Sequence, residues 1–469
     1  MFWPTLAACL TALALAGLLI LLLARPLIDL IVDRLTKRIF AKPYDKNLLE
    51  MANVATKIGP MNLAEIELRA ESGKPERRPF GGRWNRSRWD KFFFRSVYLS
   101  GQPLADPVEV DGKVTIGPAA AKPLQLEIPI MIGGMAWGNA LSRRAKIALA
   151  LGSALAGTAT NTGSGPFLPA ERAAAGKLVL QVSRGAWMRD PAILRQGDMI
   201  EISLGHGATG SSRNEIKESV LEKDPEFRAA LGGADPVVGS TLPEGWGLIP
   251  LQELVASIRA LTHGVPVGVK FGATDRLEDE LALILQAKPD FVTIDGNEGG
   301  SHGIGTAVHD SNGLPTLHAV CRADRFLRMR GVRGQMSLII GGGLYQPADF
   351  LKAMALGADA VIIGTSALLA IVHAQVEKVT PFQPPTQLVW HGGKKAGSLN
   401  PDKGALYLAR FLESCVAEMN QVAQVLGRAR LRDITRADLC CLDRDLATLA
   451  GVRWAGDPPA PEGDGEWRS

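Results

Sequence analysis

Two glycine-containing segments in the C-terminal half of the chain have the composition of a phosphate-binding site. Gly341-Gly-Gly343 follows the apolar run Ser337–Ile340, and Gly364-Thr365 follows the apolar run Ala360–Ile363. Glycine lets backbone N–H groups approach a ligand, and the helical periodicity that resumes after each segment places a helix N-terminus beside it. The alternative is that these glycines serve tight turns only. We predict a phosphate site made by Gly342, Gly343, Gly364 and Thr365.

A single lysine stands in an otherwise apolar run, Val267-Gly-Val-Lys270-Phe271. Burying an ammonium group without an anionic partner is unfavourable, so Lys270 must face either a ligand or a carboxylate of the protein. Buried lysines with perturbed pKa values gather at functional sites, although structural ion pairs also produce them. We expect Lys270 to act on a ligand, with a structural salt bridge as the alternative.

The next apolar run ends in a loop that is crowded with polar and small residues, Asp295-Gly-Asn-Glu298-Gly-Gly-Ser-His302. A carboxylate at a strand exit can bind an amine or imine, or move a proton. Such carboxylates also hold loop backbone, and a loop histidine is as often structural as catalytic. We predict Asp295 and Glu298 as catalytic residues together with Lys270, and we leave His302 open.

A further set of small and amide residues could hold a flat ring. Gly133-Gly134-Met135 follows the apolar run Ile128–Ile132, so a ring could pack closely against its backbone. Asn161 and Gln181 belong to the next two apolar segments and could hydrogen-bond a polar ring edge. Taken singly, these are ordinary turn and strand residues.

All of these residues follow or belong to short apolar runs that are candidate strands. The runs are Ile128–Ile132, Leu155–Thr160, Leu178–Val182, Met199–Leu204, Pro266–Phe271, Phe291–Asp295, Ser337–Ile340 and Ala360–Ile363. Helical periodicity lies between most of them, at Ser142–Leu151, Pro250–Leu261, Leu277–Gln286, Pro315–Met329 and Pro347–Leu356. Such alternation over about 250 residues predicts an α/β fold, a (β/α)8 barrel, with functional residues at the C-terminal ends of its strands.

The remaining segments surround the predicted barrel. The long stretch 205–265 includes a charged helical pattern at Glu215–Leu231, and we expect it to form a lid or a substrate wall. Helices are predicted at Lys403–Leu426 and around Asp438–Ala450, and Asp457–Ser469 is expected to be disordered. The predicted divisions are an anchor at 1–25, a basic approach segment at 26–120, the barrel at 121–378, a loop and helical extension at 379–453 and a tail at 454–469.

The composition sets the broad class of the protein. The chain has 469 residues, and 46% of them are hydrophobic, which permits a large core and excludes global disorder. The 52 basic and 48 acidic residues leave a formal net charge of +4, too small a bias to indicate nucleic-acid binding. The five cysteines form no C-x-x-C pair and no metal-ligand spacing, so we expect no metal site and a reducing compartment.

The N-terminus has the composition of a membrane span. Residues Leu6–Leu23 are uncharged and almost all apolar, and Arg25, Arg34 and Lys37 follow them. With no basic residue before the run, the positive-inside rule places the C-terminal part in the cytoplasm. We expect a single-pass anchor in the inner (plasma) membrane rather than a cleaved signal peptide. A second basic stretch, Arg69–Arg95, could contact anionic lipids or pack against the main domain.

Together these segments resemble the FMN-binding synthase domain of the glutamate synthase family. The resemblance covers about residues 120–375 and is carried by Pro129–Gly138, Asn161-Thr-Gly163, the Gln181 strand, Val267–Lys270, Asp295–Gly300, Gly341–Gly343 and Gly357–Thr365. It implies a flavin barrel with substrate bound over the ring. It also implies that Lys270 contacts FMN, where it could stabilise negative charge on the ring, and that Glu298 lies by the substrate.

Three departures from the family pattern bear on function. Asn161-Thr-Gly-Ser-Gly-Pro166 lacks the usual glutamate, and Ser203-Leu-Gly-His206-Gly-Ala-Thr209 lacks the usual glutamine and lysine. Residues 370–400 contain no cysteine for a 3Fe–4S cluster, and a membrane segment stands where the family has its amidotransferase domain. Glutamine hydrolysis and an internal iron–sulfur relay are therefore not expected.

The resemblance implies an FMN oxidoreductase that acts on an amino or imino acid or a 2-oxo acid, within amino-acid metabolism such as glutamate biosynthesis, and the N-terminal apolar run adds the membrane anchor. One alternative is a flavin 2-hydroxy-acid oxidase, although its His-Gly-Gly-Arg loop is replaced here by Glu298-Gly-Gly-Ser301. Another is a non-catalytic membrane scaffold derived from the barrel. The expected partners are a small-molecule substrate, the membrane and an unidentified electron donor or amidotransferase, with homo-oligomerisation left open and no nucleic acid.

Overall fold

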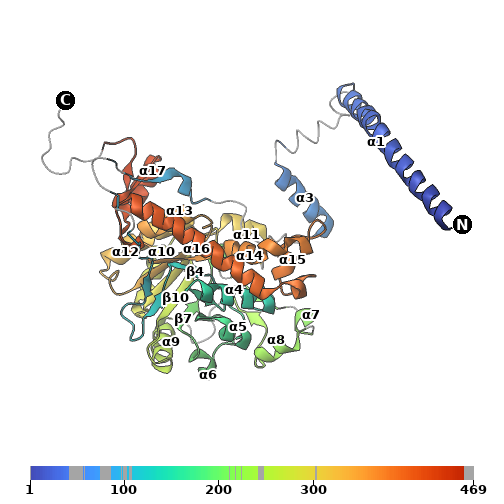
Figure 1. Ribbon diagram of the computed structural model, residues 1–469. Helices are drawn as coiled ribbons and strands as arrows, with labels where there is room; N and C mark the ends of the chain where they lie inside the picture. The colour runs from blue at the N-terminus through green and yellow to red at the C-terminus, as the bar shows by residue number, and fades with distance from the viewer. Residues whose placement is uncertain are drawn as a thin grey trace, which may run out of the picture. The chain divides into compact units, whose positions relative to one another are not determined.

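The computed structural model describes residues 2–41, 56, 59–73, 86–96, 98, 103–104, 108–210, 212–216, 218–222, 224–240, 248–300 and 304–458. The chain divides into two compact units, residues 1–76 and residues 77–469. The first contains α1 (Phe2–Phe40) and α3 (Pro60–Ser72), and the second contains the large sheet with its surrounding helices (Figure 1).

Helix α1 contains the predicted apolar segment. Its residues Phe2–Lys37 are long and apolar enough to cross a membrane, and their side chains are not buried by the protein. Such a surface is unfavourable in water and favourable in a bilayer. The helix continues through Pro26 to Phe40. A signal sequence near the N-terminus can meet the same criteria of length and hydropathy, so the helix alone does not separate an anchor from a signal.

The second unit confirms the predicted (β/α)8 barrel. Its strands are β4 (Ile130–Ile132), β5 (Ala159–Asn161), β6 (Lys177–Val182), β7 (Met199–Ser203), β10 (Val267–Gly272), β11 (Phe291–Asp295), β12 (Ser337–Gly341) and β13 (Ala360–Ile363). They form one parallel sheet in the order β4-β13-β12-β11-β10-β7-β6-β5. The Thr158 hydroxyl donates to the Ile130 carbonyl at 2.7 Å and links the two ends.

Each of the eight predicted strands is present. The second begins at Ala159 rather than at Leu155, because helix α4 (Arg143–Leu155) runs to that residue and Gly157, with φ 68°, turns the chain into the strand. Glycine adopts this left-handed conformation without a steric penalty.

Strand side chains alternate between the inside and the outside of the barrel, as the period of two requires. The interior layer at the N-terminal end of the barrel is apolar. It includes Met131, Val179, Met199, Phe291 and Ile339. A hairpin of β2 (Val114–Ile116) and β3 (Leu124–Leu126) packs against this layer and closes the N-terminal end of the barrel. Polar side chains occupy the interior positions nearer the C-terminal ends of the strands, so only that end can hold a polar ligand.

Helices surround the sheet, as Figure 1 shows. They are α4, α5 (Pro169–Ala174), α6 (Pro191–Leu194), α9 (Leu248–Leu261), α10 (Leu277–Gln286), α11 (Thr306–Ser311), α12 (Thr316–Met329), α13 (Pro347–Ala355) and α14 (Thr365–Val372). The Ser142 hydroxyl accepts from the Ala145 N–H at 3.2 Å and caps α4, which fixes where that helix begins.

The long stretch between β7 and β10 is not one charged helix, so the prediction at Glu215–Leu231 is wrong in detail. It contains η3 (Gly207–Thr209), a short hairpin of β8 (Asn214–Glu215) and β9 (Val237–Val238), and two helices, α7 (Glu218–Leu221) and α8 (Pro225–Ala230). Asp224 accepts from the Phe227 N–H at 2.9 Å and Pro225 follows it, so a new helix starts there.

The C-terminal extension packs beside the barrel. It contains η4 (His373–Lys378), α15 (Thr386–Val389), η5 (Ala396–Ser398), α16 (Pro401–Val425), η6 (Leu431–Asp433), η7 (Arg436–Asp438), β14 (Leu439–Cys441), α17 (Arg444–Ala450) and β15 (Arg453–Trp454). Helix α16 confirms the helix predicted at Lys403–Leu426, and the predicted final helical piece is a strand followed by a shorter helix.

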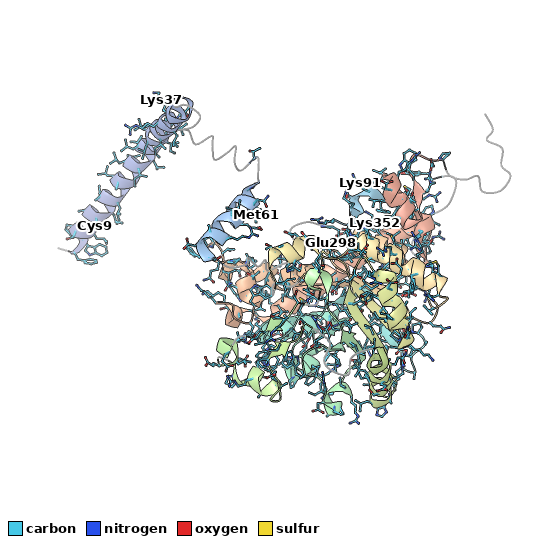
Figure 2. The ribbon with its side chains drawn as sticks, turned by 180° about the vertical axis from the view of Figure 1, so that it is seen from behind. Cys9, Lys37, Met61, Lys91, Glu298 and Lys352 are labelled. Carbon is cyan, nitrogen blue, oxygen red and sulfur yellow. The ribbon has the colours of Figure 1, made fainter. Side chains whose placement is uncertain are left out.

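The described part of the predicted basic approach segment packs on the barrel. Residues 86–94 include η2 (Trp89–Lys91) and β1 (Phe92–Phe94), which pairs with β14. Trp89 is buried, and its carbonyl accepts from the Lys352 Nζ at 2.9 Å. Figure 2 labels Lys91 of this stretch together with Glu298 and Lys352, to which residues 86–89 are hydrogen-bonded. Residues 86–94 therefore pack against the main domain, which was one of the two alternatives for the basic stretch Arg69–Arg95. Residues 74–85 lie outside the described residues.

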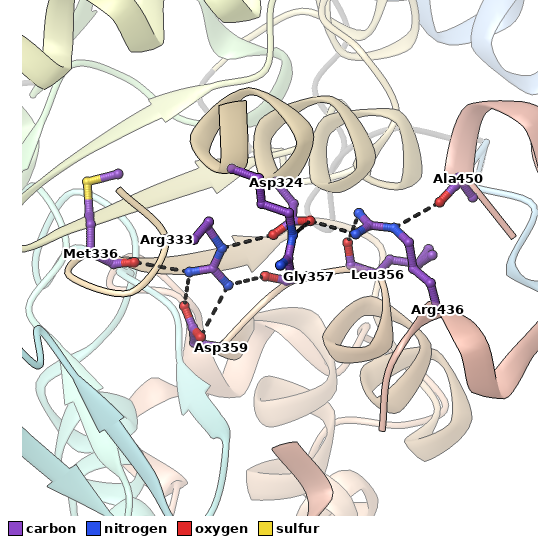
Figure 3. A network of polar contacts seen from close by, with 9 residues as sticks. Asp324, Arg333, Met336, Leu356, Gly357, Asp359, Arg436 and Ala450 are labelled. Carbon is purple, nitrogen blue, oxygen red and sulfur yellow. Dashed lines mark hydrogen bonds and ion pairs between the residues drawn. The ribbon is translucent and has the colours of Figure 1, made fainter. Parts of the chain in front are cut away.

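A buried ionic network ties the extension to the base of the barrel (Figure 3). We call Asp324, Arg328, Arg333, Asp359 and Arg436 the base cluster. The Asp324 carboxylate accepts from Arg333 Nε at 2.9 Å, Arg328 Nε at 2.7 Å and Arg436 Nη1 at 2.6 Å. Arg333 Nη1 also lies 2.9 Å from Asp359 Oδ2. Arg333 also donates to the backbone carbonyls of Met336 and Gly357. Arg436 donates to those of Leu356 and Ala450.

Candidate functional site

A cavity opens at the C-terminal ends of the barrel strands. The predicted site residues that line it are Gly133, Gly134, Met135, Lys270, Asp295, Glu298, Gly342, Gly343, Gly364 and Thr365. Asn161 and Gln181 are buried nearby but do not line it. His302 lies outside the described residues. Segments that are more than 200 residues apart in sequence therefore meet around one opening, as the barrel topology requires.

The two predicted phosphate-binding segments face this cavity. Gly342 and Gly343 have φ values of 109° and 63°, and a Cβ on Gly342 would lie 2.7 Å from the Thr316 hydroxyl. Gly364 precedes α14, whose first N–H groups have no partner within the helix. A Cβ on Gly364 would meet nothing closer than the Met135 sulfur at 4.0 Å, so open space lies in front of this backbone.

The exit of β4 lies against the two amide side chains. A Cβ on Gly134 would come within 2.9 Å of Asn161 Oδ1 and 3.0 Å of Gln181 Nε2, so only glycine fits there. The Met135 carbonyl accepts from Lys146 Nζ at 2.8 Å, and that ammonium pairs with Glu171 at 2.8 Å. This exit is thus a flat, fixed surface with the amides behind it.

Glu201 in β7 organises the amides and was not among the predicted residues. Its Oε1 accepts from Asn161 Nδ2 at 2.9 Å and from Gln181 Nε2 at 2.7 Å. Its sequence signal is the same as that of Lys270, a lone charge in an apolar run, Met199-Ile-Glu201-Ile. Because an interior carboxylate must be compensated, the amides of Asn161 and Gln181 have a structural function here in addition to any contact with a ligand.

Lys270 forms the salt bridge that was the alternative considered for it, and it also lines the cavity. Its Nζ lies 3.0 Å from Asp295 Oδ2, and both side chains are buried yet line the cavity. Burial disfavours the ammonium, but the carboxylates of Asp295 and Glu201 outweigh burial and raise the pKa of Lys270 above its ordinary value. The cavity therefore keeps a fixed cation beside a carboxylate.

Glu298 is held by four hydrogen bonds from the protein. Its Oε1 accepts from the Ser87 hydroxyl at 2.7 Å and the Arg86 N–H at 3.1 Å. Its Oε2 accepts from the Thr316 hydroxyl at 2.8 Å and the Thr316 N–H at 2.9 Å. These donors fill the acceptor sites of an ionised carboxylate, so Glu298 is better suited to present a fixed negative charge than to carry a proton.

His206 also lines the cavity, on the loop that follows β7. Burial, followed by the positive charges of Lys270 and Arg184, lowers the pKa of His206 to about 3. The imidazole is therefore neutral across the physiological range. In the sequence, His206 stands out only as part of the segment that departs from the family pattern.

The residues present fit a phosphorylated flat ring such as FMN. The glycine segments line the cavity, and open space lies in front of Gly364 at the start of α14, which suits a phosphate. The Gly133–Met135 surface suits a ring, with Lys270 available to its electron-rich edge. Among the described residues no group of three or more potential metal-ligating side chains occurs.

Comparisons with known proteins agree with this geometry. Residues 104–428 match the conserved region in glutamate synthase. A glutamate synthase large subunit-like protein of Rhizobium meliloti is 31% identical over 414 residues, which cover 84% of this chain and 93% of that protein. An archaeal-type glutamate synthase (NADPH) of Thermotoga neapolitana is 30% identical over 335 residues, 71% of this chain and 66% of that protein.

Solved structures confirm the fold. The flavin-binding domain of baker's yeast flavocytochrome b2 superposes with a TM-score of 0.51 at 16% identity, covering 82% of this chain and 84% of that one. At this identity the likeness shows the barrel alone. The enzyme class and the cofactor rest on the sequence relatives, which confirm the oxidoreductase class and the FMN that the resemblance implied. The chain belongs to the glutamate synthase family.

Proposed function

We propose that this protein is a membrane-anchored oxidoreductase that interconverts an amino acid and the corresponding imino or 2-oxo acid. The observation that carries the proposal is the pairing of Lys270 with Asp295 at 3.0 Å inside the cavity that the glycine segments also line. FMN supplies hydride transfer when it is bound. The protein must then supply binding, orientation and charge.

The roles of the residues follow from their contacts. Gly342, Gly343, Gly364 and Thr365 would hold the phosphate, and Gly133–Met135 would support the ring. Lys270 would stabilise negative charge at the ring edge. Asp295, which keeps this lysine charged, would position the substrate nitrogen or take its proton. Glu298 would favour a protonated amine or imine through its fixed negative charge, since all of its acceptor sites are filled.

The membrane location is part of the proposal. The apolar helix Phe2–Lys37 supports an anchor, and Arg25, Arg34 and Lys37 after its apolar part support a cytoplasmic barrel. Extraction of membranes at alkaline pH should leave the full chain in the pellet. Release of a chain that lacks the first 25 or so residues would instead identify a cleaved signal.

Two readouts test the chemistry. The full chain, extracted in mild detergent, should be yellow, with the absorbance near about 450 nm that oxidised flavin shows. Glutamate or another amino acid should bleach this absorbance without oxygen. Bleaching by 2-hydroxy acids alone would favour a 2-hydroxy-acid oxidase, and a yellow protein that no donor of either class bleaches would favour the scaffold.

The source of electrons needs a separate test. Some relatives are named as NADPH-dependent glutamate synthases, so NADPH is the first donor to examine. We expect that NADPH alone reduces the flavin slowly and that a partner protein accelerates it. Fast reduction by NADPH alone would show that no such partner is needed.

A further inference from the structure

A buried ammonium group, which the proposed chemistry does not use, lies behind the exits of β4 and β5. It belongs to Lys146 of α4, whose side chain is 1% exposed. Its Nζ donates to the carbonyls of Met135 and Asn161, each at 2.8 Å, and lies 2.8 Å from Glu171 Oε1. An ammonium has three protons, so these three short contacts use all of them. The Thr162 carbonyl is a fourth, longer contact at 3.4 Å.

Glu171 of α5 is the counter-charge of this ammonium. Its side chain is also 1% exposed, and within the described ranges no donor other than Lys146 reaches either of its oxygens. Burial raises the pKa of Glu171 above its ordinary value, although the charge of Lys146 opposes this. The carboxylate therefore serves the ammonium and no other described group.

Stability alone does not account for this pair. Removing two charges from water costs much of what their attraction returns, and an apolar pair of similar volume would hold α4 against α5 about as well. A cation near the N-terminus of α4 also opposes the helix dipole. What an apolar side chain cannot replace is the set of hydrogen bonds from Lys146 to the strand exits.

These hydrogen bonds fix the backbone at the edge of the cavity. Met135 follows β4 and lines the cavity, and Asn161 ends β5. Because a trans peptide is planar, a Met135 carbonyl held toward the ammonium directs the Ala136 N–H the other way. Ala136 lines the cavity, and its N–H has no acceptor in the part of the chain that the structure describes. A carbonyl bound to a cation also polarises its peptide, which makes this N–H a stronger donor.

We propose that Lys146, compensated by Glu171, is a positioning residue for the flavin. It holds the ends of β4 and β5 in the conformation that supports the ring, and its positive charge favours the electron-rich reduced form of the cofactor. Lys146 does not line the cavity, so it acts through the backbone and through its charge. The inference rests on the proposed placement of the ring at Gly133–Met135 and is independent of the substrate.

The test uses full chains in detergent with FMN as the ligand. FMN affinity is read from the quenching of its fluorescence, and the reduction potential from titration with dithionite and a reference dye. Glu171→Gln keeps the shape but removes the counter-charge, so the potential should rise. Lys146→Met combined with Glu171→Gln removes the ammonium without leaving a lone carboxylate, so the potential should fall. Each shift should correspond to about tenfold or more in the reduction equilibrium, which is about 30 mV for two electrons.

The double variant should also bind FMN about tenfold or more weakly, as the loss of hydrogen bonds from a charged group predicts. Lys352→Met is the matched control. Lys352 is another buried lysine, and its Nζ donates to the Trp89 carbonyl at 2.9 Å, but it does not line the cavity. This variant should lower the melting temperature and leave FMN affinity and potential unchanged. Shifts in Lys352→Met as large as those in the double variant would overturn the inference.

The two opposite shifts separate positioning from mere structural support, which would change the melting temperature alone. If both variants keep the wild-type potential, or if both move it in the same direction, the inference is overturned, while reduction of the wild-type flavin by amino acids can still support the proposed function. Should the double variant fail to fold, an unchanged or lower potential in Glu171→Gln overturns the inference by itself. Opposite shifts in a protein that no amino acid reduces would retain the inference and overturn the proposed function.

Discussion

The two ends of the barrel differ in how completely their buried polar groups are compensated. At the base, Asp324 accepts from three arginines, and Arg333 contacts two carboxylates and two backbone carbonyls. At the C-terminal end, Lys270 pairs with Asp295 inside the cavity, whereas the His206 ring, which lines the same cavity, has no hydrogen bond among the described residues. Arg184, which follows β6 and does not line the cavity, donates to the Ser240 carbonyl and has no carboxylate partner among the described residues.

The difference also appears in the pKa values. Burial alone would raise the pKa of Asp324, but hydrogen bonds from Arg328, Arg333 and Arg436 outweigh burial and lower it. At the other end, the carboxylates of Asp295 and Glu201 outweigh burial and raise the pKa of Lys270, but burial prevails for His206 and Arg184 and lowers the pKa of both. The base cluster and the Lys270–Asp295 pair are therefore compensated within the protein, whereas His206 and Arg184 have no carboxylate partner among the described residues.

The largest effect is expected at the base. Asp324→Ala leaves Arg333 and Arg436 without their shared acceptor, and breaking a buried ion network of this kind costs about 3–5 kcal/mol of unfolding free energy. Urea unfolding of the larger unit measures this loss. The control is Arg328→Gln, because Arg328 is 60% exposed and an exposed pair contributes about 1 kcal/mol or less. Equal losses of unfolding free energy in both variants would contradict the claim that the buried Asp324 contacts stabilise the base of the barrel.

The second effect concerns the cavity. Lys270→Met removes the cation beside Asp295 and should lower flavin occupancy or slow flavin reduction about 100-fold, the size of effect seen when one preorganised charge is lost. The barrel should remain folded, as far-ultraviolet circular dichroism can show. Full flavin occupancy with unchanged reduction kinetics would count against the role assigned to Lys270.

A third effect, small near neutral pH, is the dependence of stability on pH. The pKa of His206 is about 3 in the folded protein and near its ordinary value of 6.5 when unfolded. Between these values the unfolded chain binds a proton that the folded chain does not, so stability falls as the pH decreases from about 6.5 towards 3. Denaturation of His206→Asn over this range should show a shallower decline. A decline identical to that of the wild type would show that His206 does not remain neutral.

The smallest effect is a slow thiol reaction. Burial raises the pKa of Cys321 in α12 to about 12, and its neighbours include Arg436 and Asp324 of the base cluster. The folded protein should leave Cys321 unmodified by maleimide near neutral pH, as mass spectrometry of peptides would show. Asp324→Ala should increase its modification. Rapid modification in the wild type would mean that the base cluster opens readily.

Local sequence patterns predict the barrel well because the residues that end a strand lie next to it in the sequence. The runs that end at Gly133, Asp295 and Gly341 carry their own period and their own glycines, so β4, β11 and β12 can be placed from short windows. The phosphate segments follow for the same reason. Helix α10 matches its predicted range Leu277–Gln286 at both ends.

Long-range contacts escape such patterns. Nothing local to Glu298 indicates that Ser87, 211 residues away, donates to it, or that Thr316 fills its other oxygen. Glu201 could have been found as a lone charge in a strand, but its amide partners depend on which strands become neighbours. The single helix expected at Glu215–Leu231 failed because the capping effect of Asp224-Pro225 outweighed the charge pattern.

The central claim is that the glycine segments hold a mononucleotide phosphate, and the most direct test is the flavin stoichiometry of Gly364→Val. A Cβ at Gly364 meets nothing closer than the Met135 sulfur at 4.0 Å, so this variant should keep its melting temperature yet block the phosphate and lose most of its FMN. Gly334→Val is the matched control, since Gly334 is equally open and lies before β12, away from the cavity. Full FMN occupancy in Gly364→Val, or a wild-type protein that is colourless and cannot be reconstituted with FMN, would contradict the account.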